Sequence, residues 1–554
     1  MRDLEGTMPL SMMVRERATY DPDGAAYLAA GGTYPWSRYD ETADRLAAKL
    51  AGLARVPGSG MGPGARVAVW LPDSPRLHAV YLACERAGLV VVGIPGRAGD
   101  LELGHLLRKT GASLLICPPA HRERTAAAIV AGLRGDKTNL PSTRPLPLAL
   151  HAELGSGGTL RVFRWDAGDT PSPVDVPRAR RGNDAGLGVD DLWLLNSTSG
   201  TTGLSKCVEQ TQRTWLSLAR HAIGGAAITE NDVIMSAVPS PFGYGLWTAH
   251  LLPALLGIPC VLRERFDPDR TLRAVAGRRG TLPGHRVTVL ACVTTQLRLM
   301  LASPLMDELD WSALRVTFTG GERTPPEVIA EWERRTGSAV LQFYGSNEFG
   351  GFSGTTLADS EQARRSTAGR VLPGIRYRIY DDAGADITTT GDPGQPGGAG
   401  PGVTGGYYGD PDATAELYHP DGHQLLPDLV TVDASGYVRV AGRKADLIIR
   451  GGKNISAAAV ETEVAAHPSV AEVAAIAVPD RTFGERVCAA VTLRPDAAGP
   501  ELTVATLREF LAGRGVSKEY FPEHVVVLDE MPVSMGGKIA RNALRTQVLR
   551  TLRR

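Results

Sequence analysis

The stretch Ser197–Lys206 (STSGTTGLSK) decides the fold, because hydroxyls and glycines lead to a lysine. It follows the apolar run Trp193–Leu195 after one residue. Glycines let backbone N–H groups converge on an anion, and Ser and Thr hydroxyls add donors. A Walker A loop needs Gly immediately before its Lys, whereas Ser205 stands there in this chain. Only eight of the 60 basic residues are lysine, so Lys206 is informative. We interpret the segment as a phosphate-binding loop rather than a flexible Ser/Gly linker.

Strands and helices alternate in the part of the chain that precedes this loop. Short apolar runs bounded by Pro and Gly predict strands, and leucines or valines at helical spacing predict helices between them. The expected elements are the strands Arg66–Leu71, Leu89–Ile94 and Ser113–Cys117 and the helices Pro75–Ala87 and Leu101–Thr110. This alternation implies a buried, mostly parallel sheet.

Two segments read as connections without regular structure. Gly135–Asp190 shows little periodicity and is rich in Pro, Gly, Asp and Arg, so we expect a long surface connection. Gly391–Gly406 holds eight Gly and three Pro, and we expect a loop there rather than a dinucleotide-binding fingerprint.

The last hundred residues change character. They predict helices at Ala457–Ala466 and Val504–Leu511 and strands at Val470–Val478 and Val487–Leu493. The sequence therefore predicts an α/β fold with a large N-terminal domain of parallel-rich sheets and helices, residues 1–443, and a small α+β C-terminal domain, residues 444–554.

Composition excludes several classes of protein. The chain has 554 residues, 43% hydrophobic and 22% charged, and 60 basic residues balance 60 acidic ones. These values are typical of a globular protein rather than a disordered chain, a coiled coil or a collagen-like repeat. A zero net charge argues against a protein that binds bulk nucleic-acid phosphate.

Cysteine spacing and apolar segments indicate the compartment. No two of the six cysteines have CxxC spacing, and most lie in apolar runs, as expected of buried thiols in a reducing cytoplasm. The N-terminus lacks an uninterrupted apolar run, and the apolar stretch Leu251–Leu262 is interrupted by Pro253, Gly257 and Pro259. We therefore expect a cytoplasmic protein without a signal peptide or a membrane span.

Five segments together resemble one family. The loop SGTTGLSK looks like the phosphate loop of adenylate-forming enzymes, the group of acyl-CoA synthetases, peptide-synthetase adenylation domains and luciferases. The other four segments occur in the family's order and cover nearly the whole chain: TGGE at 319–322, FYGSNEFGG at 343–351, GRKADLIIRGGKNIS at 442–456 and PVSMGGKIAR at 532–541. The RGGxNIS form is most similar to acyl-CoA synthetases.

The resemblance implies a binding site for ATP and Mg²⁺. Tyr344 would stack on adenine, Glu348 would hold Mg²⁺ and so also serve catalysis, and Asn347 replaces the family threonine that faces phosphate oxygen. Asp428 and Arg443 would contact the ribose, although Leu426-Pro427 replaces the usual Thr-Gly before the aspartate. The remaining nucleotide-binding positions are Ser199, Gly200, Thr201, Thr202, Gly203 and Lys206 at the phosphates, and Gly320, Gly321, Glu322 and Gly345 at the turns near the adenine.

The resemblance also implies that the C-terminal domain is mobile. Lys538 would be the catalytic lysine, because an ammonium group can neutralise the charge that gathers on the α-phosphorus. The domain would swing about the segment Gly442–Asp446 and withdraw Lys538, so that a pantetheine thiol can enter. Ala445 stands where the family commonly has a polar hinge residue.

The segment Val238–Leu246 (VPSPFGYGL) departs most from the family. Phe242 occupies a position that often holds His or another aromatic residue beside the acid. Phe242, Tyr244 and Trp247 either line a pocket for the acid or belong to the core, and the sequence leaves both readings open.

Four functions follow as alternatives. The first is an AMP-forming acid–CoA ligase that activates a carboxylic acid, apolar or aryl, with ATP and Mg²⁺. The second loads the acyl group onto a phosphopantetheinyl carrier protein. The third is an atypical adenylate-forming enzyme that activates nitrite or forms an amide, which the substitutions Phe242, Asn347 and Leu426-Pro427 suggest. The fourth, a non-catalytic nucleotide-binding relative, is disfavoured because Lys206, Glu348, Asp428 and Lys538 are all present.

Overall fold

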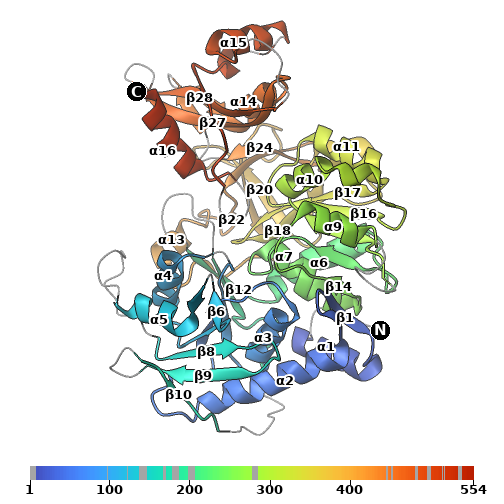
Figure 1. Cartoon of the computed structure of the whole chain (residues 1–554). Helices are drawn as coiled ribbons and strands as arrows, with labels where there is room; N and C mark the ends of the chain where they lie inside the picture. The colour runs from blue at the N-terminus through green and yellow to red at the C-terminus, as the bar shows by residue number, and fades with distance from the viewer. Residues whose placement is uncertain are drawn as a thin grey trace. The chain divides into compact units, whose positions relative to one another are not determined.

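The computed structural model shows an α/β protein with two compact units (Figure 1). The structure describes residues 8–96, 98–121, 123–135, 146, 148–165, 170–177, 186–197, 206–277, 285–443, 447–450, 453–480, 484–495, 501–514, 516, 518–533 and 539–553. The first unit comprises the described residues within 1–198, 204–376 and 399–418, and the second those within 377–398 and 419–554.

An eight-stranded sheet forms one half of the first unit, with the strand order β10-β9-β8-β5-β3-β4-β11-β12. Its central strands are parallel, and β9, β10 and β12 are antiparallel to their neighbours. The strands are β3 (Arg66–Val69), β4 (Val90–Gly93), β5 (Leu114–Cys117), β8 (Leu150–Leu154), β9 (Leu160–Arg164), β10 (Ser172–Pro173), β11 (Leu194–Ser197) and β12 (Cys207–Gln210).

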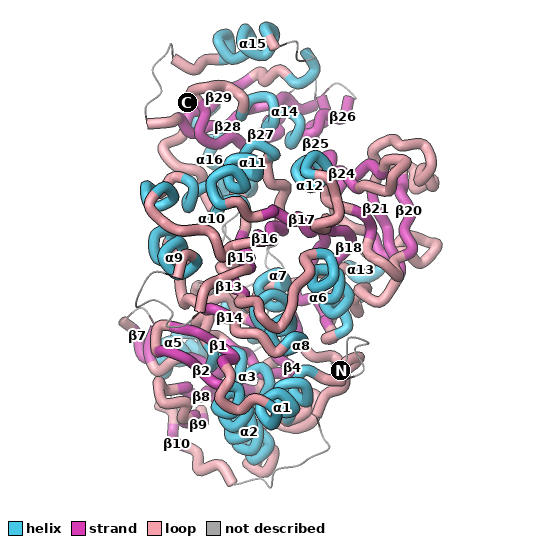
Figure 2. The backbone as a smooth tube through the Cα atoms, turned by 90° about the vertical axis from the view of Figure 1, so that its right-hand side faces the viewer, coloured by secondary structure: helices cyan, strands magenta, loops and turns pink. Residues whose placement is uncertain are grey.

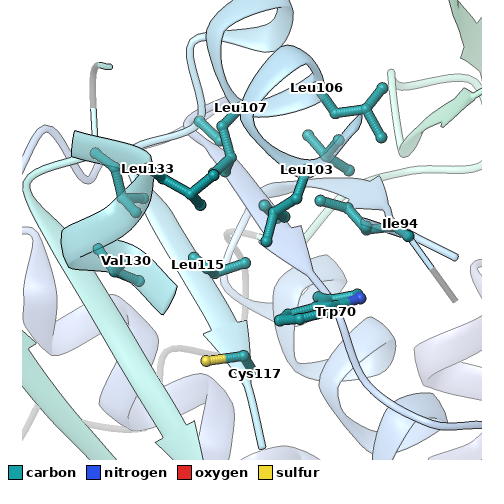
Figure 3. Close-up of a cluster of buried hydrophobic side chains, with 14 of the residues drawn as sticks. Trp70, Ile94, Leu103, Leu106, Leu107, Leu115, Cys117, Val130 and Leu133 are labelled. Atoms are coloured by element: carbon teal, nitrogen blue, oxygen red, sulfur yellow. The ribbon is translucent and has the colours of Figure 1, made fainter. Parts of the chain in front are cut away.

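Helices α4 (Asp100–Thr110) and α5 (Ala126–Gly135) cover this sheet with apolar side chains (Figure 3). Leu115 and Cys117 of β5 point to the same face, because side chains alternate along a strand. They pack with Leu103 of α4 and Val130 of α5, and all four side chains are buried. Helix α3 (Pro75–Arg86) begins where Ser74 Oγ accepts from the N–H of Leu77, and α4 ends at Gly111 with φ +63°.

A nine-stranded sheet forms the other half, with the order β19-β18-β17-β16-β15-β13-β14-β1-β2. Figure 2 shows β13, β15, β16 and β17 side by side, and these strands are parallel. The strands are β1 (Ala25–Ala29), β2 (Gly32–Pro35), β13 (Ile234–Ser236), β14 (Cys260–Val261), β15 (Val289–Cys292), β16 (Val316–Gly320), β17 (Ala339–Ser346), β18 (Gly350–Gly354) and β19 (Arg370–Val371).

Further elements complete the first unit. The helices are α1 (Leu10–Tyr20), α2 (Trp36–Leu53), α6 (Arg213–Gly225), α7 (Gly243–Leu246), α8 (Leu252–Leu256), α9 (Pro268–Val275), α10 (Thr294–Leu301), α11 (Pro326–Thr336), α12 (Glu361–Ser366) and α13 (Pro411–Ala415). A π-helix at Trp247–Leu251 joins α7 to α8, a 3₁₀ turn spans Pro304–Asp307, and β6 (Ala120–His121) pairs with β7 (Arg124–Thr125).

The second unit contains three small sheets. β20 (Arg376–Tyr380), β21 (Gln395–Ala399) and β22 (Gln424–Leu425) form one, and β23 (Asp428–Val432) with β24 (Val438–Arg443) forms another. The third has five strands: β25 (Leu447–Arg450), β26 (Lys453–Ser456), β27 (Val470–Asp480), β28 (Gly484–Leu493) and β29 (His524–Val527).

Alternation along β28 gives the five-stranded sheet two apolar faces. One face packs against α14 (Ala457–Ala465) and α15 (Val504–Gly513), and the other against α16 (Arg541–Leu552). A 3₁₀ turn at Lys518–Tyr520 precedes β29. This arrangement is the α+β C-terminal part that the sequence predicts, and the α/β fold class is confirmed. The proposed division at residue 443 stays a prediction, since residues 444–446 lie outside the described residues.

Two predicted connections contain strands. β8, β9 and β10 extend the eight-stranded sheet within Gly135–Asp190, and β21 lies within Gly391–Gly406, so both predictions were wrong in part. Strands at a sheet edge depend on the neighbour they pair with more than on their own periodicity. Among the described residues, no helix is both long and apolar enough to cross a membrane.

Candidate active site

The predicted phosphate loop connects two strands that hold each other in register. β11 and β12 are antiparallel, and Ser197 pairs with Cys207 at the end of the ladder. The connecting segment 198–205, with Ser199, Gly200, Thr201, Thr202 and Gly203, lies outside the described residues. Lys206 is described, and its position follows from its place directly before β12.

Lys206 lies against an aromatic ring that the sequence analysis does not identify. Its Nζ is 4.5 Å from the ring centroid of Tyr407, which is within the range of a cation–π interaction. Tyr407 follows a pair of glycines in the segment that precedes α13. The ring therefore limits where the Lys206 ammonium can move.

The hydroxyl of the same tyrosine binds Glu348. Tyr407 Oη donates to Glu348 Oε1 at 2.9 Å, and Thr404 Oγ1 donates to the backbone oxygen of Glu348. Burial, and then the negative charge of Glu348, raise the pKa of Tyr407 far above its usual value, so the phenol stays a donor. One phenol thus links the loop lysine to the predicted metal-binding carboxylate.

Glu348 fits the role of a divalent-cation ligand. Its side chain is half-buried, and among the described residues only Tyr407 hydrogen-bonds its carboxylate. Lone pairs on both oxygens remain for a hard cation, which prefers carboxylate ligands.

Tyr344 and Gly345 lie in β17, and Asn347 lies in the turn that joins β17 to β18. A Cβ on Gly345 would lie 2.0 Å from the backbone oxygen of Gly350, so glycine is required there. Gly350 has φ +79°, which favours glycine as well. Tyr344 is half-buried and meets Phe352 edge to face, with ring centroids 5.8 Å apart.

The predicted TGGE turn lies at the same sheet edge. β16 and β17 are parallel, and Gly320 pairs with Phe343, the residue before Tyr344. A Cβ on Gly320 would lie 2.7 Å from the backbone oxygen of Phe343, and Gly321 has φ +81°. The structure therefore brings Gly320, Gly321 and Glu322 to the side of Tyr344.

The three aromatic residues of the predicted acid pocket differ in burial. Phe242 caps α7 and is half-buried, as is Tyr244, whose Oη donates to the backbone oxygen of Cys292 at 3.3 Å. Trp247 is 1% exposed and packs against Phe318 and Phe343 at centroid distances of 5.8 and 5.4 Å. Trp247 is thus part of the core, while Phe242 and Tyr244 keep exposed surface.

Asp428 and Arg443 lie in the second unit. They are paired residues at the end of the β23–β24 ladder, and Asp428 is mostly buried. Lys538 lies outside the described residues.

Comparisons with known proteins identify the family of the chain. The family model described as AMP-binding enzyme matches residues 14–408, and the model of the AMP-binding enzyme C-terminal domain matches residues 459–538. The chain belongs to the AMP-binding enzyme family. The family resemblance read from the five motifs is confirmed.

Two relatives are named as CoA synthases or ligases of acids. A feruloyl-CoA synthase from Amycolatopsis sp is 32% identical, and the match covers 96% of this chain and 97% of that one. The medium-chain fatty-acid–CoA ligase of Escherichia coli is 29% identical over 94% of this chain and 87% of its own length. ATP-bound MatB from Rhodopseudomonas palustris has a similar structure, with a TM-score of 0.79 and 27% identity, covering 97% and 99% of the two chains.

Proposed function

We propose that this family member is an AMP-forming acid–thiol ligase with CoA as the acceptor. The observation that carries the proposal is the chain of contacts Lys206–Tyr407–Glu348, in which Glu348 follows Tyr344 of β17 by four residues. This chain of contacts supports the proposal, because an ATP-dependent adenylating enzyme requires a cation, a carboxylate that can bind a metal ion and a flat aromatic ring.

The reaction joins the acid to AMP before the thioester forms. A carboxylate is a poor electrophile, because expelling oxide is unfavourable at neutral pH. Its oxygen attacks the α-phosphorus of ATP, the bond to the β-phosphate breaks, and pyrophosphate leaves. A thiolate then attacks the acyl carbon, and AMP leaves with the electron pair of the C–O bond.

The chain's own residues position these groups. The loop residues 199–203 with Lys206 hold the β- and γ-phosphates, Gly320, Gly321, Glu322, Gly345 and Tyr344 hold the adenine, and Asp428 and Arg443 hold the ribose. Mg²⁺ bound at Glu348 would neutralise charge on the departing pyrophosphate. Lys538 steadies the attacking carboxylate and the α-phosphate.

The acid is apolar or aryl. Phe242 and Tyr244 carry no charge, and the Tyr244 hydroxyl donates to the Cys292 backbone oxygen. These two residues therefore offer no cation to a second carboxylate of the acid. The 32% identity to a feruloyl-CoA synthase, named for an aryl acid, supports the same class.

A carrier protein is the second candidate acceptor. A relative from Mycobacterium tuberculosis, named salicyl-AMP ligase / salicyl-S-ArCP synthetase, is 28% identical over 97% of this chain and 90% of its own. We propose CoA first, because the RGGKNIS segment resembles that of acyl-CoA synthetases. We also propose a cytoplasmic location, where the six buried free thiols fit a reducing environment.

Pyrophosphate release tests the proposal. The purified chain is given ATP, Mg²⁺ and a panel of aryl and aliphatic acids, with and without CoA. We expect release that CoA stimulates and a CoA thioester detected by mass. If only a holo-carrier protein or an amine stimulates the release, that compound and not CoA is the acceptor. No release with any acid, but AMP formation with nitrite, would overturn acid activation.

A further inference from the structure

Asn347 lies where the stem of the phosphate loop meets the acid segment. Its side chain contacts Asn196 of β11, and its backbone oxygen contacts Gln210 of β12. A Cβ on Gly243, next to Phe242, would lie 2.8 Å from Asn347 Oδ1. The residue that replaces the family threonine is therefore held by two strands and borders a third segment.

A tryptophan fixes the orientation of the Gln210 amide. Trp215 Nε1 can only donate a hydrogen bond, and it lies 3.1 Å from Gln210 Oε1. The amide nitrogen of Gln210 then faces the backbone oxygen of Asn347 at 2.7 Å, which can only accept. Both ends of the Gln210 amide are thus assigned by partners with a single role.

The orientation passes from Gln210 to Asn196. Because Gln210 Oε1 is an acceptor, it is the nitrogen of Asn196 that faces it, at 3.4 Å. The same nitrogen donates to Asn347 Oδ1 at 3.3 Å. Asn196 and Gln210 are fully buried, so solvent does not compete for these groups.

The Asn347 amide is left with its donors open. Its oxygen accepts from Asn196, and among the described residues no group accepts from its nitrogen. Asn347 itself is half-buried, whereas the residues that orient it are buried. An amide fixed in this way presents N–H groups to a ligand and keeps its oxygen away from it.

We propose that Trp215, Gln210 and Asn196 are positioning residues that hold the Asn347 side chain so that Nδ2 donates to an anionic oxygen of the reacting carboxylate or phosphate. This relay rests on the proposed function. A threonine hydroxyl can rotate to donate without such support, whereas an asparagine amide turned the wrong way would place its oxygen against the anion. The relay is what makes asparagine workable at this position.

A double-mutant cycle tests the relay. Asn196→Leu removes the donor to Asn347 and also removes Asn196 Oδ1, which is buried without a hydrogen-bond partner among the described residues, so we expect the fold to persist. We expect Asn196→Leu and Asn347→Ala each to lower kcat/KM for pyrophosphate release about tenfold. The double variant should be no worse than Asn347→Ala alone. Effects that multiply would overturn the relay.

The kinetic constants identify the anion. A rise in KM for the acid at unchanged KM for ATP assigns the donor to the carboxylate, and the reverse assigns it to the nucleotide phosphate. Gln342→Leu is the matched control, because the Gln342 amide donates to the backbone oxygens of Arg364 and Thr367 instead. It should leave both constants unchanged.

A spectroscopic test does not depend on turnover. In protein labelled with ¹⁵N-asparagine, the side-chain signal lost in Asn347→Ala identifies that amide. The signal should shift in Asn196→Leu and in Trp215→Phe, which lacks the indole N–H. An unmoved signal would refute the relay even if the chain activates no acid, while turnover failure with a moved signal would refute the function alone.

Discussion

Two polar clusters border the segment Val238–Leu246. They differ in burial and in how many hydrogen bonds their members make to one another. The open cluster is Lys206, Tyr407, Glu348 and Asn347, and all four side chains are half-buried. The closed cluster is Asp73, His78, Ser240, His250 and Tyr39, in which all but Asp73 are buried.

Most polar groups of the closed cluster have partners within it, although His250 Nε2 is buried without a hydrogen-bond partner among the described residues. Asp73 accepts from both the N–H and the Oγ of Ser240, and its Oδ1 is 3.3 Å from His78 Nε2. His78 Nδ1 lies 3.1 Å from His250 Nδ1, and Tyr39 Oη lies 3.4 Å from the same atom. Burial and the neighbouring His78 lower the pKa of His250 well below its usual value, so this imidazole stays neutral. On the proposed function, we expect the open cluster to serve catalysis and the closed cluster to contribute to stability.

The largest expected effect comes from the open cluster. Glu348→Gln removes the charge that would hold Mg²⁺, and we expect pyrophosphate release to fall about 1,000-fold, or about 4 kcal/mol, with an unchanged Tm. Glu327→Gln, an exposed residue of α11, is the control and should keep full activity. A large drop in Tm for Glu348→Gln would place this carboxylate among the stability groups instead.

Another buried histidine extends the comparison to pH. His151 Nδ1 accepts from Trp165 Nε1 at 2.8 Å, and burial lowers the pKa of His151 to about 4. Below about pH 6.5 the unfolded chain binds a proton at His151, whereas the folded chain binds it only near pH 4. The free energy of unfolding therefore falls on acidification from about pH 6.5 to about 4. The free energy of unfolding decreases by about 3 kcal/mol over this range.

His151→Gln should reduce this dependence. A glutamine oxygen accepts from Trp165 and does not titrate. We expect the Tm of the variant to change less between pH 7 and pH 4.5 than that of the wild type. Glu153, whose Oε1 lies 3.9 Å from His151 Nε2, is present in both proteins. Any effect of this carboxylate on Tm is therefore common to the two curves. Parallel Tm curves for the two proteins would contradict the assignment.

A smaller effect on stability is expected in the closed cluster. Ser240→Ala removes one of the donors to Asp73 and should cost about 1.5 kcal/mol, which lowers Tm by a few degrees. Pyrophosphate release at saturating substrates should stay within about twofold. If KM for the acid rises strongly while Tm is unchanged, the closed cluster serves the acid segment directly and the comparison fails.

The smallest effect separates the two interactions of Tyr407. Tyr407→Phe keeps the ring beside Lys206 but loses the bond to Glu348, and we expect about fivefold lower pyrophosphate release, or about 1 kcal/mol. Tyr407→Leu also loses the cation–π contact and should be a further threefold slower. Calorimetric titration with Mg²⁺·ATP should show weaker binding in the same order. Equal behaviour of the two variants would leave the ring face without a role.

Residues of the open cluster could be predicted from the sequence where binding a ligand restricts the residue type. Lys206, Glu348, Tyr344 and the glycines belong to short ordered motifs, so their elements and their family could be predicted. Tyr407 could not, because it lies 59 residues from Glu348, and Asn196 lies 151 residues from Asn347. Contacts of this kind are fixed by tertiary packing and leave no local pattern.

The strands of the fold also differ in how well the sequence predicts them. The parallel strands β3, β4 and β5 are buried on both faces, so their apolar runs identify them. β9 (LRVFR) and β21 (QPGGA) carry polar, exposed or glycine positions and exist because a neighbouring strand pairs with them. The closed cluster left no signal, since its histidines and Asp73 are distributed over the chain.

Isotope transfer tests the central claim, adenylation of the acid, most directly. An acid that supports turnover is labelled with ¹⁸O in both carboxylate oxygens and converted to the thioester with ATP and CoA. Attack of the carboxylate on the α-phosphorus predicts AMP that carries one ¹⁸O. Unlabelled AMP, or label in inorganic phosphate with formation of ADP, would contradict the account.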